Sequence, residues 1–287
     1  MNCDLHNHSI YSDGTYTPEQ LVKEAERLGL SAIALTDHNT VMGLERFFAC
    51  GKNSNVKLVG GIEFSTDYKG TELHILGLFV PESEKDNIEA IVTKAIKLKD
   101  QSNIDVVNKI RDMGYDISYE EIKNSSPSGK INRANIASVM VKKNIVESVS
   151  EAFEKFLNPK LGLYHPPKKL SALDIIDVIN NMGAVSVWAH PFLDLKTEER
   201  IREFLDDAKA HHLDGMEVHY SKFTDEQTEC AERLAEEYGL LKSGGSDFHG
   251  DNKPEIGMGK GKGNLCIPYE FYKNLEKRYR EKNNIEI

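Results

Sequence analysis

Histidines and carboxylates recur after short apolar segments along the whole chain, and this recurrence most strongly constrains the fold. His6 and His8 follow the first such segment, and Asp37 and His38 follow the second, residues 31–35. A single polar residue after a strand would mean little. A series of them is expected where a barrel of parallel strands brings the carboxyl ends of its strands together. The pattern therefore predicts an α/β barrel with a polar cluster at one end of its sheet.

The residues in this series are of the two types that bind transition metals, imidazole and carboxylate. Side chains alternate along an extended strand, so His6 and His8 point to the same side and can bind one ion together. Imidazole suits Zn, Fe and Mn, and carboxylate suits Mn and Mg, so a mixed set predicts Mn²⁺, Fe²⁺ or Zn²⁺. The set is larger than one tetrahedral zinc ion needs, so we expect two or three divalent ions. The candidate ligands are His6, His8, Asp13, His38, Glu63, His74, His190, Asp247 and His249.

Each candidate also has an ordinary structural interpretation. His74 lies inside an apolar strand, where a histidine is more often a hydrogen-bonded core residue. His190 precedes a proline and Asp13 precedes a glycine, so both suit turns. Asp4 and Asp37 are expected to orient histidines rather than to bind metal. The interpretation as ligands therefore rests on the candidates occurring together, at the same end of successive strands.

Strand and helix signals alternate over residues 1–80 and 166–287, and the pattern changes between them. Strands are expected near residues 4, 33, 59, 76, 187, 217 and 242. Thr17 and Pro18 are typical of a helix start, and Gly29 of its end. The alternation predicts parallel pairing and a distorted (β/α)7 barrel that carries the metal centre. Residues 81–165 show helical spacing, so we expect a helical insertion that covers the active site, with its most flexible loop at residues 124–129.

Composition excludes several classes of function. Lys and Arg number 36 against 46 Asp and Glu, a net charge of −10, which argues against binding nucleic acids or membranes through a broad basic face. No apolar segment approaches the ~20 residues of a membrane span, and no signal peptide is evident. The four cysteines show no paired spacing and are expected to be reduced thiols. We expect a cytoplasmic protein with no obligate protein partner.

The charge of the expected centre favours a phosphate ester as substrate. Three divalent ions would carry six positive charges, of which Asp13, Glu63 and Asp247 would neutralise only three, so the centre would stay cationic. Water bound to such ions can lose a proton near neutral pH, and the resulting hydroxide can attack phosphorus in line. We therefore expect hydrolysis of a phosphomonoester by a metal-bridging hydroxide, without a nucleophilic side chain.

These segments resemble the motifs of the PHP family (polymerase and histidinol phosphatase domains), and the resemblance covers nearly the whole chain. The similar segments are residues 4–9 with 12–14, 35–38, 61–63, 189–191 and 245–249. The resemblance implies a distorted seven-stranded β/α barrel with a di- or trinuclear centre. It implies one ion among His6, His8, Glu63 and Asp247, a second among Glu63, His74 and His190, and a third among Asp13, His38 and His249.

Within this family, the chain is most similar to stand-alone phosphoesterases that act on nucleoside monophosphates, nucleoside 3′,5′-bisphosphates or the 5′ ends of short RNAs. The resemblance implies that Arg133 in the insertion helps to bind phosphate, and we expect Ser12 and His219 to bind it together with Arg133. Asn135 and residues 219–223 depart from the pattern of that branch, which leaves the metal ligands intact and the choice of substrate open. The residues expected to be catalytic are metal ligands: Asp13, His38, Glu63, His190 and His249.

Other functions stay open at this point. A histidinol-phosphate phosphatase would use the same chemistry on an amino-alcohol ester. A nuclease could trim RNA from its 5′ end, although the acidic net charge disfavours long polymers. A non-catalytic metal-binding scaffold module is a further alternative. A site that no longer catalyses a reaction should lose metal ligands, whereas the set of candidate ligands in this chain is complete. The expected partner is a small phosphorylated substrate, in the first place a nucleotide, or a short single-stranded RNA.

Overall fold

The computed structural model describes residues 1–51, 54–125, 131–167, 169–263 and 265–286. The chain divides into two units, Met1–Ala90 with Leu170–Ile287 and Ile91–Lys169, which we call the barrel unit and the inserted unit. The first unit brings together the two outer parts of the sequence. Most of the loop that the sequence predicts to be flexible, residues 124–129, lies outside the described residues.

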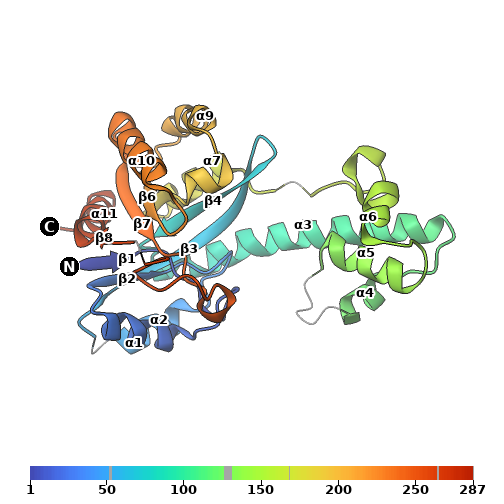
Figure 1. Ribbon diagram of the computed structural model, residues 1–287, viewed down its shortest axis with the longest axis horizontal. Coiled ribbons are helices and arrows are strands. Elements are labelled where there is room, and N and C mark those ends of the chain that lie inside the picture. Colours follow the sequence, from blue (N-terminus) through green and yellow to red (C-terminus); the bar gives the residue numbers. More distant parts are fainter. Residues whose placement is uncertain (52–53, 126–130, 168, 264, 287) are drawn as a thin grey trace. The chain divides into compact units, whose positions relative to one another are not determined.

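One eight-stranded sheet forms the barrel unit, in the order β7-β6-β5-β4-β3-β2-β1-β8 (Figure 1). The strands are β1 (Asn2–Asp4), β2 (Ala32–Leu35), β3 (Lys57–Tyr68), β4 (Thr71–Leu78), β5 (Val185–Trp188), β6 (Gly215–Tyr220), β7 (Leu241–Gly245) and β8 (Ile267–Pro268). The seven expected strands are confirmed, and β8, which pairs antiparallel with β1, was not predicted. Past β1 and β7 the chain nearly closes the sheet, because Leu5 N donates to Gly244 O at 3.1 Å and His8 N donates to Phe248 O at 2.9 Å. The predicted distorted barrel is therefore confirmed.

Strands β1 and β2 pair parallel, as the first strand–helix–strand unit predicts. β3 and β4 instead form an antiparallel hairpin, and β4 also pairs antiparallel with β5, so the parallel pattern does not extend to β4. β3 does not end before Glu63 but continues to Tyr68. Lys69 and Gly70 make the two-residue turn, with φ of 49° and 82°, as a type I′ turn requires. His74 lies near the start of β4 and pairs with Ser65. It reaches the cluster because its strand runs opposite to its neighbours.

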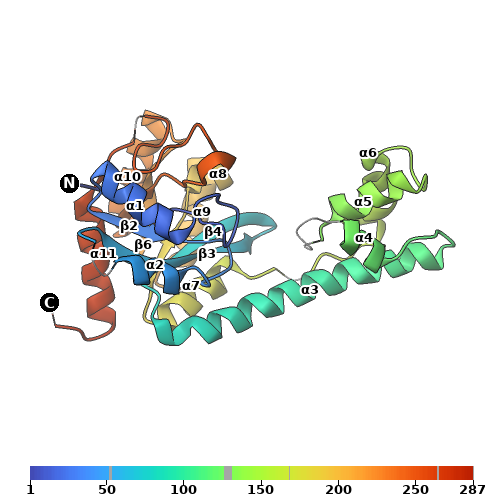
Figure 2. The same cartoon turned by 90° about the horizontal axis from the view of Figure 1, so that it is seen from below.

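Helices cover the outside of the sheet (Figures 1 and 2). They are α1 (Pro18–Leu28), α2 (Leu44–Cys50), α7 (Ala172–Asn181), α8 (Pro191–Asp194), α9 (Glu198–Lys209), α10 (Asp225–Tyr238) and α11 (Tyr269–Lys282), with a 3-10 turn at Gly250–Asn252. Helix α1 begins and ends as predicted: the Thr17 hydroxyl accepts from Gln20 N, and Gly29 is left-handed with φ of 69°. Its buried face, which includes Leu21 and Ala25, packs with Ile33 of β2.

The inserted unit has its own core and shows helices but no strand among its described residues. Helix α3 (Lys85–Asp112) leads into it, preceded by a 3-10 turn at Glu82–Glu84. The other helices are α4 (Tyr119–Ser125), α5 (Arg133–Lys142), α6 (Val149–Ala152), a π-helical turn at Phe153–Leu157 and a 3-10 turn at Pro159–Leu161. Their buried apolar side chains, such as Ile110, Ile136 and Phe156, pack together. In the part of the chain that the structure describes, no helix combines the length and the apolar character that a bilayer crossing requires.

A glycine allows the end of β7 to approach the segment after β1. A Cβ atom built on Gly245 would lie 2.1 Å from the Cβ atom and 2.8 Å from the backbone nitrogen of His6. A methyl group does not fit there, so only glycine permits this approach. The approach brings His6 and His8 next to Asp247.

Gly245→Ala is expected to lower the free energy of unfolding by about 3 kcal/mol, at the upper end of what overpacking a core costs. Gly257→Ala is the matched control, because a Cβ atom there meets its nearest neighbour at 3.7 Å, an ordinary contact. Urea unfolding of the demetallated proteins, followed by circular dichroism, measures both changes. Equal stability of the two variants would contradict this role of Gly245.

Candidate metal centre

The carboxylate of Glu63, on β3, is fully buried and lies at the middle of the predicted ligands. Three imidazole nitrogens face its Oε2 atom: His6 Nε2 at 3.2 Å, His8 Nε2 at 3.2 Å and His38 Nδ1 at 2.9 Å. Two others face its Oε1 atom: His74 Nδ1 at 2.9 Å and His190 Nε2 at 3.1 Å. The two oxygens thus face two different groups of imidazoles, the arrangement of a carboxylate that can bridge two ions.

Asp247 completes the group around Oε2 of Glu63. Its Oδ1 atom lies 3.3 Å from His8 Nε2 and 3.8 Å from His6 Nε2. Donor atoms that each lie about 2.1 Å from one tetrahedral ion are separated by roughly 3.4 Å. The separations of His6 and His8 from Glu63 and Asp247 lie between 3.2 and 3.8 Å, close to this value. His6, His8 and Asp247 each offer one donor atom within 4.8 Å of the other two, so these atoms are compatible with one divalent ion.

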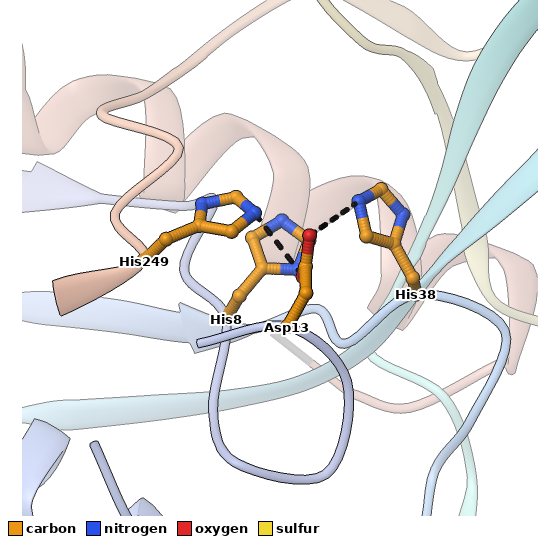
Figure 3. Close-up of side chains that lie close together, drawn as sticks. All are labelled: His8, Asp13, His38 and His249. Carbon is orange, nitrogen blue, oxygen red and sulfur yellow. Dashed lines mark ion pairs between the residues drawn. The ribbon is translucent and has the colours of Figure 1, made fainter. Parts of the chain in front are cut away.

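A further group lies around Asp13 (Figure 3). The Asp13 carboxylate is 3.2 Å from His249 Nε2, 3.6 Å from His8 Nδ1 and 3.9 Å from His38 Nε2. Each of these four residues offers one donor atom within 4.8 Å of the other three. The Asp13 side chain is 55% exposed, whereas His8 and His249 are buried. This group therefore contains the most exposed of the candidate ligands.

Several buried donor atoms of the cluster lack a hydrogen-bond partner among the described residues. They are His6 Nε2, His8 Nε2, His38 Nδ1, Glu63 Oε2 and His249 Nε2. An unsatisfied buried polar atom costs about 1–3 kcal/mol, and here such atoms face one another. Divalent cations between them would satisfy these atoms, and imidazole with carboxylate suits Mn, Fe or Zn. The cluster is therefore compatible with divalent metals.

The charges of the cluster shift the pKa values of its members in opposite directions. Burial would raise the pKa of Glu63, but the positive charges of His6, His38 and His74 outweigh burial and hold it well below its usual range. Burial would lower the pKa of His74, but Glu63 raises it to about 10. The pKa of His190 is about 9, because Asp194 and Glu63 outweigh burial. Without a metal ion, His74 and His190 therefore hold protons in the place of cations.

Strand β6 supplies two contacts that sequence reasoning missed. Glu217, fully buried, places Oε1 3.0 Å from His6 Nδ1, and Tyr220 donates its hydroxyl to Asp247 Oδ2 at 2.8 Å. The register of β6 shifts between Glu217 and His219. A bulge changes the alternation of side chains, so Glu217 and Tyr220 can both reach the cluster. In the sequence, only the presence of a carboxylate within an apolar strand could have indicated that Glu217 belongs to the site. No such feature indicated Tyr220.

Lys253 is another contact that the sequence did not indicate. Its Nζ atom donates to Asp247 Oδ2 at 2.8 Å, beside the Tyr220 hydroxyl. Oδ2 of Asp247 is therefore held by two donors, while Oδ1 faces His6 and His8. No spacing or strand pattern connects Lys253 to the ligands, because it follows them in a loop.

Asp4 and Asp37 are not donors in any of the groups of three or more possible metal ligands found among the described residues, in agreement with the sequence. The backbone N–H of His6 donates to Asp4 Oδ1 at 3.4 Å, and among the described residues no hydrogen bond or ion pair joins either carboxylate to a histidine ring. Asp37 accepts from the backbone N–H and hydroxyl of Ser9 at 2.8 and 2.6 Å. Asp4 accepts from the backbone N–H of Ser246 at 2.9 Å and of Gly259 at 2.7 Å. Their carboxylates hold the loops that carry the ligands.

The residues predicted to bind phosphate have other partners in the structure. Ser12 donates its hydroxyl to Asp37 Oδ1 at 2.6 Å. His219 lies with Nε2 2.8 Å from Glu232 Oε1 and Nδ1 3.2 Å from the Cys266 carbonyl oxygen.

Arg133 belongs to the inserted unit, where its guanidinium group packs over the rings of Tyr164 at 4.8 Å and Phe153 at 5.5 Å. It also donates to the Leu157 carbonyl oxygen at 3.2 Å. The phosphate-binding roles of Ser12, Arg133 and His219 stay predictions, as does the cover that residues 81–165 were expected to give.

Relatives named for their action on phosphate esters match most of the chain. A 5′-3′ exoribonuclease of Haemophilus influenzae is 29% identical over 246 residues, which cover 86% of this chain and 89% of the relative. A 3′,5′-nucleoside bisphosphate phosphatase of Chromobacterium violaceum is 26% identical over 287 residues, covering 96% and 97%. A solved structure from Bifidobacterium adolescentis, described as a metal-dependent phosphoesterase, has 27% identity and a TM-score of 0.66 over 96% of each chain. The protein is thus a phosphoric ester hydrolase.

The family assignment rests on a match over the first part of the chain. The family model for the PHP domain matches residues 4–173, more than half of the 287 residues. This segment contains the candidate ligands from His6 to His74, and the structure adds His190, Asp247 and His249 to the same cluster. The chain belongs to the PHP domain family.

Proposed function

We propose that the protein is a metal-dependent phosphomonoesterase that acts on nucleotides: a nucleoside monophosphate, a nucleoside 3′,5′-bisphosphate or the 5′ end of a short RNA. The convergence of imidazoles and carboxylates around Glu63, with buried donor atoms left unpaired, carries this proposal. The names of the relatives support a nucleotide as the substrate. The alternative functions are a histidinol-phosphate phosphatase and a non-catalytic metal-binding scaffold module.

In this proposal the ligands divide into three sets, and Glu63 belongs to two of them. The sets are His6, His8, Glu63 and Asp247; Glu63, His74 and His190; and Asp13, His38 and His249. Divalent ions held there would supply a water molecule of lowered pKa and positive charge for the phosphate oxygens. The metal could be Mn²⁺, Fe²⁺ or Zn²⁺, since all three accept imidazole with carboxylate.

The residues themselves would orient the reaction. Asp13 is the ligand most open to solvent, so the phosphate would enter on its side of the cluster. Glu63 is held between imidazoles on both oxygens, which fixes the spacing between two of the sets. Tyr220 and Lys253 hold one oxygen of Asp247 and leave the other for the ligand set.

Three substrates would separate the proposal from its alternatives. The manganese-loaded protein is expected to release phosphate from AMP or adenosine 3′,5′-bisphosphate with a kcat/KM at least about tenfold above that for histidinol phosphate, a difference of about 1.4 kcal/mol in transition-state binding. Initial rates of phosphate release measure this, and a length series of 5′-phosphorylated oligoribonucleotides shows whether longer chains are accepted. A preference for histidinol phosphate would reverse the assignment, and no release from any ester would favour the scaffold.

His38→Ala is expected to lower bound metal and phosphate release together, because His38 faces Glu63 with Nδ1 and Asp13 with Nε2. We expect kcat/KM to fall at least about 100-fold, as for loss of a metal ligand and its charge stabilisation. His211→Ala is a matched control, since His211 pairs with Asp177 on the surface. Metal analysis and initial rates on the same preparations test this. Turnover equal to that of the control would show that His38 is not a ligand.

Metal binding to the demetallated protein is expected to release protons. The pKa values of about 10 for His74 and about 9 for His190 keep both rings protonated at pH 7, and only a neutral imidazole binds metal. The apparent affinity for Zn²⁺ should therefore rise as the pH rises from 6 towards 8. Calorimetric titration in two buffers of different ionisation enthalpy counts the protons. Identical heats of Zn²⁺ binding in both buffers would show that no protons are released, and would contradict the protonation of His74 and His190 in the demetallated protein.

A further inference from the structure

One buried carboxylate on β6 contacts two ligands that belong to different sets. Glu217 is fully buried. Its Oε1 atom lies 3.0 Å from His6 Nδ1, and its Oε2 atom accepts from the backbone N–H of His190 at 2.8 Å. His6 faces Asp247 and His8, whereas His190 faces Oε1 of Glu63. Each oxygen of Glu217 is therefore committed to a different histidine.

The contact with His6 selects the form of its ring. A carboxylate accepts hydrogen bonds, so the nitrogen beside Glu217, Nδ1, carries the proton. When the ring is neutral, as metal binding requires, its lone pair then lies on Nε2. This atom faces Glu63 Oε2 at 3.2 Å and has no hydrogen-bond partner among the described residues. Ligand histidines commonly donate their second N–H to a carboxylate, which fixes the ring and makes it a better donor to metal.

The contact with His190 selects a backbone conformation. The backbone of His190 has φ of 32° and ψ of 55°. These angles lie in the left-handed region, which residues other than glycine rarely adopt. Such strain persists only where neighbouring contacts fix it. The backbone N–H of His190 is held by its hydrogen bond to Glu217 Oε2. In this conformation the Nε2 atom of the His190 ring lies 3.1 Å from Glu63 Oε1.

No lysine or arginine pairs with Glu217 in the described ranges of the chain. Its side chain is 0% exposed, so water does not compensate its charge. The only ion-pair partner that the structure gives it is the His6 ring. A buried carboxylate that serves packing alone would be poorly placed here, because its charge is uncompensated unless the histidine beside it is positively charged or bound to a cation.

We propose that Glu217 is a positioning residue that holds His6 and His190 for two adjacent metal ions at once, so that one side chain tunes the affinity of both sites. This inference rests on the proposed metal-dependent function. Glutamine has the same shape but one oxygen, so Glu217→Gln cannot accept from both His6 and His190. One of the two N–H groups then loses its acceptor, and at least one site loses its preset ligand.

The test compares Glu217→Gln with Glu232→Gln as the matched control. Glu232 also pairs with a histidine, His219, at 2.8 Å, but neither residue is among the potential ligand groups. Competition with a chromogenic chelator measures Zn²⁺ affinity, and the visible spectrum of the Co²⁺-loaded protein reports ligand geometry. We expect Glu217→Gln to bind Zn²⁺ about 10–100-fold more weakly than the wild type and to change the Co²⁺ spectrum, and the control to match the wild type.

Thermal unfolding with and without zinc distinguishes the proposed positioning role of Glu217 from a role in packing alone. Loss of packing would lower the Tm of both forms equally, whereas loss of positioning reduces the rise in Tm that Zn²⁺ produces. If Glu217→Gln does not fold, Glu217→Asp replaces it, because the shorter side chain keeps the charge but cannot reach both histidines. Wild-type zinc affinity and an unchanged Co²⁺ spectrum in the folded variant would overturn the inference. A wild type that binds neither ion would instead refute the proposed function.

Discussion

The burial of Glu63 among imidazoles is the interaction on which the rest of the site depends. A carboxylate removed from water is costly unless charges and hydrogen bonds compensate it. Here the compensating rings come from the segments after β1 and β2, from β4 and from the end of β5. The cluster around Glu63 therefore requires all of these strands to be in place. Segments that are distant in sequence are coupled through this one side chain.

The backbone around the cluster is less regular than the rest of the sheet. His190 and Asp247 are both left-handed, with φ of 32° and 57°, and neither is glycine. Such conformations cost of order 1–3 kcal/mol each and persist where contacts fix them. Glu217 fixes the backbone of His190, while Tyr220 and Lys253 fix the carboxylate of Asp247. These contacts, none of them made by a predicted ligand, hold the predicted ligands in place.

The sequence predicted which side chains gather in the cluster better than it predicted the strand geometry that brings them together. Side-chain type and position after an apolar segment suffice for residues such as His6 and Asp247, because strand ends converge in any barrel. His74 reaches the cluster from a strand that runs the other way, and the hairpin that turns at Lys69 and Gly70 was not predicted. The bulge in β6 was not predictable, because it arises from pairing with β7 rather than from local preference, and Glu217 and Tyr220 were therefore missed.

The geometry of the cluster distinguishes positions where a substitution would disturb the fold and the cluster from positions where it would not. A substitution at Gly245 or Glu63 alters the fold and the cluster together, because both lie where the sheet closes or converges. The departures from the family pattern are elsewhere. His219 is engaged by Glu232 and the Cys266 carbonyl oxygen, and Asn135 closes the first turn of α5 with Asn132. The partners that the structure gives His219 and Asn135 are not candidate ligands, so changes at these two positions leave the contacts among the candidate ligands intact.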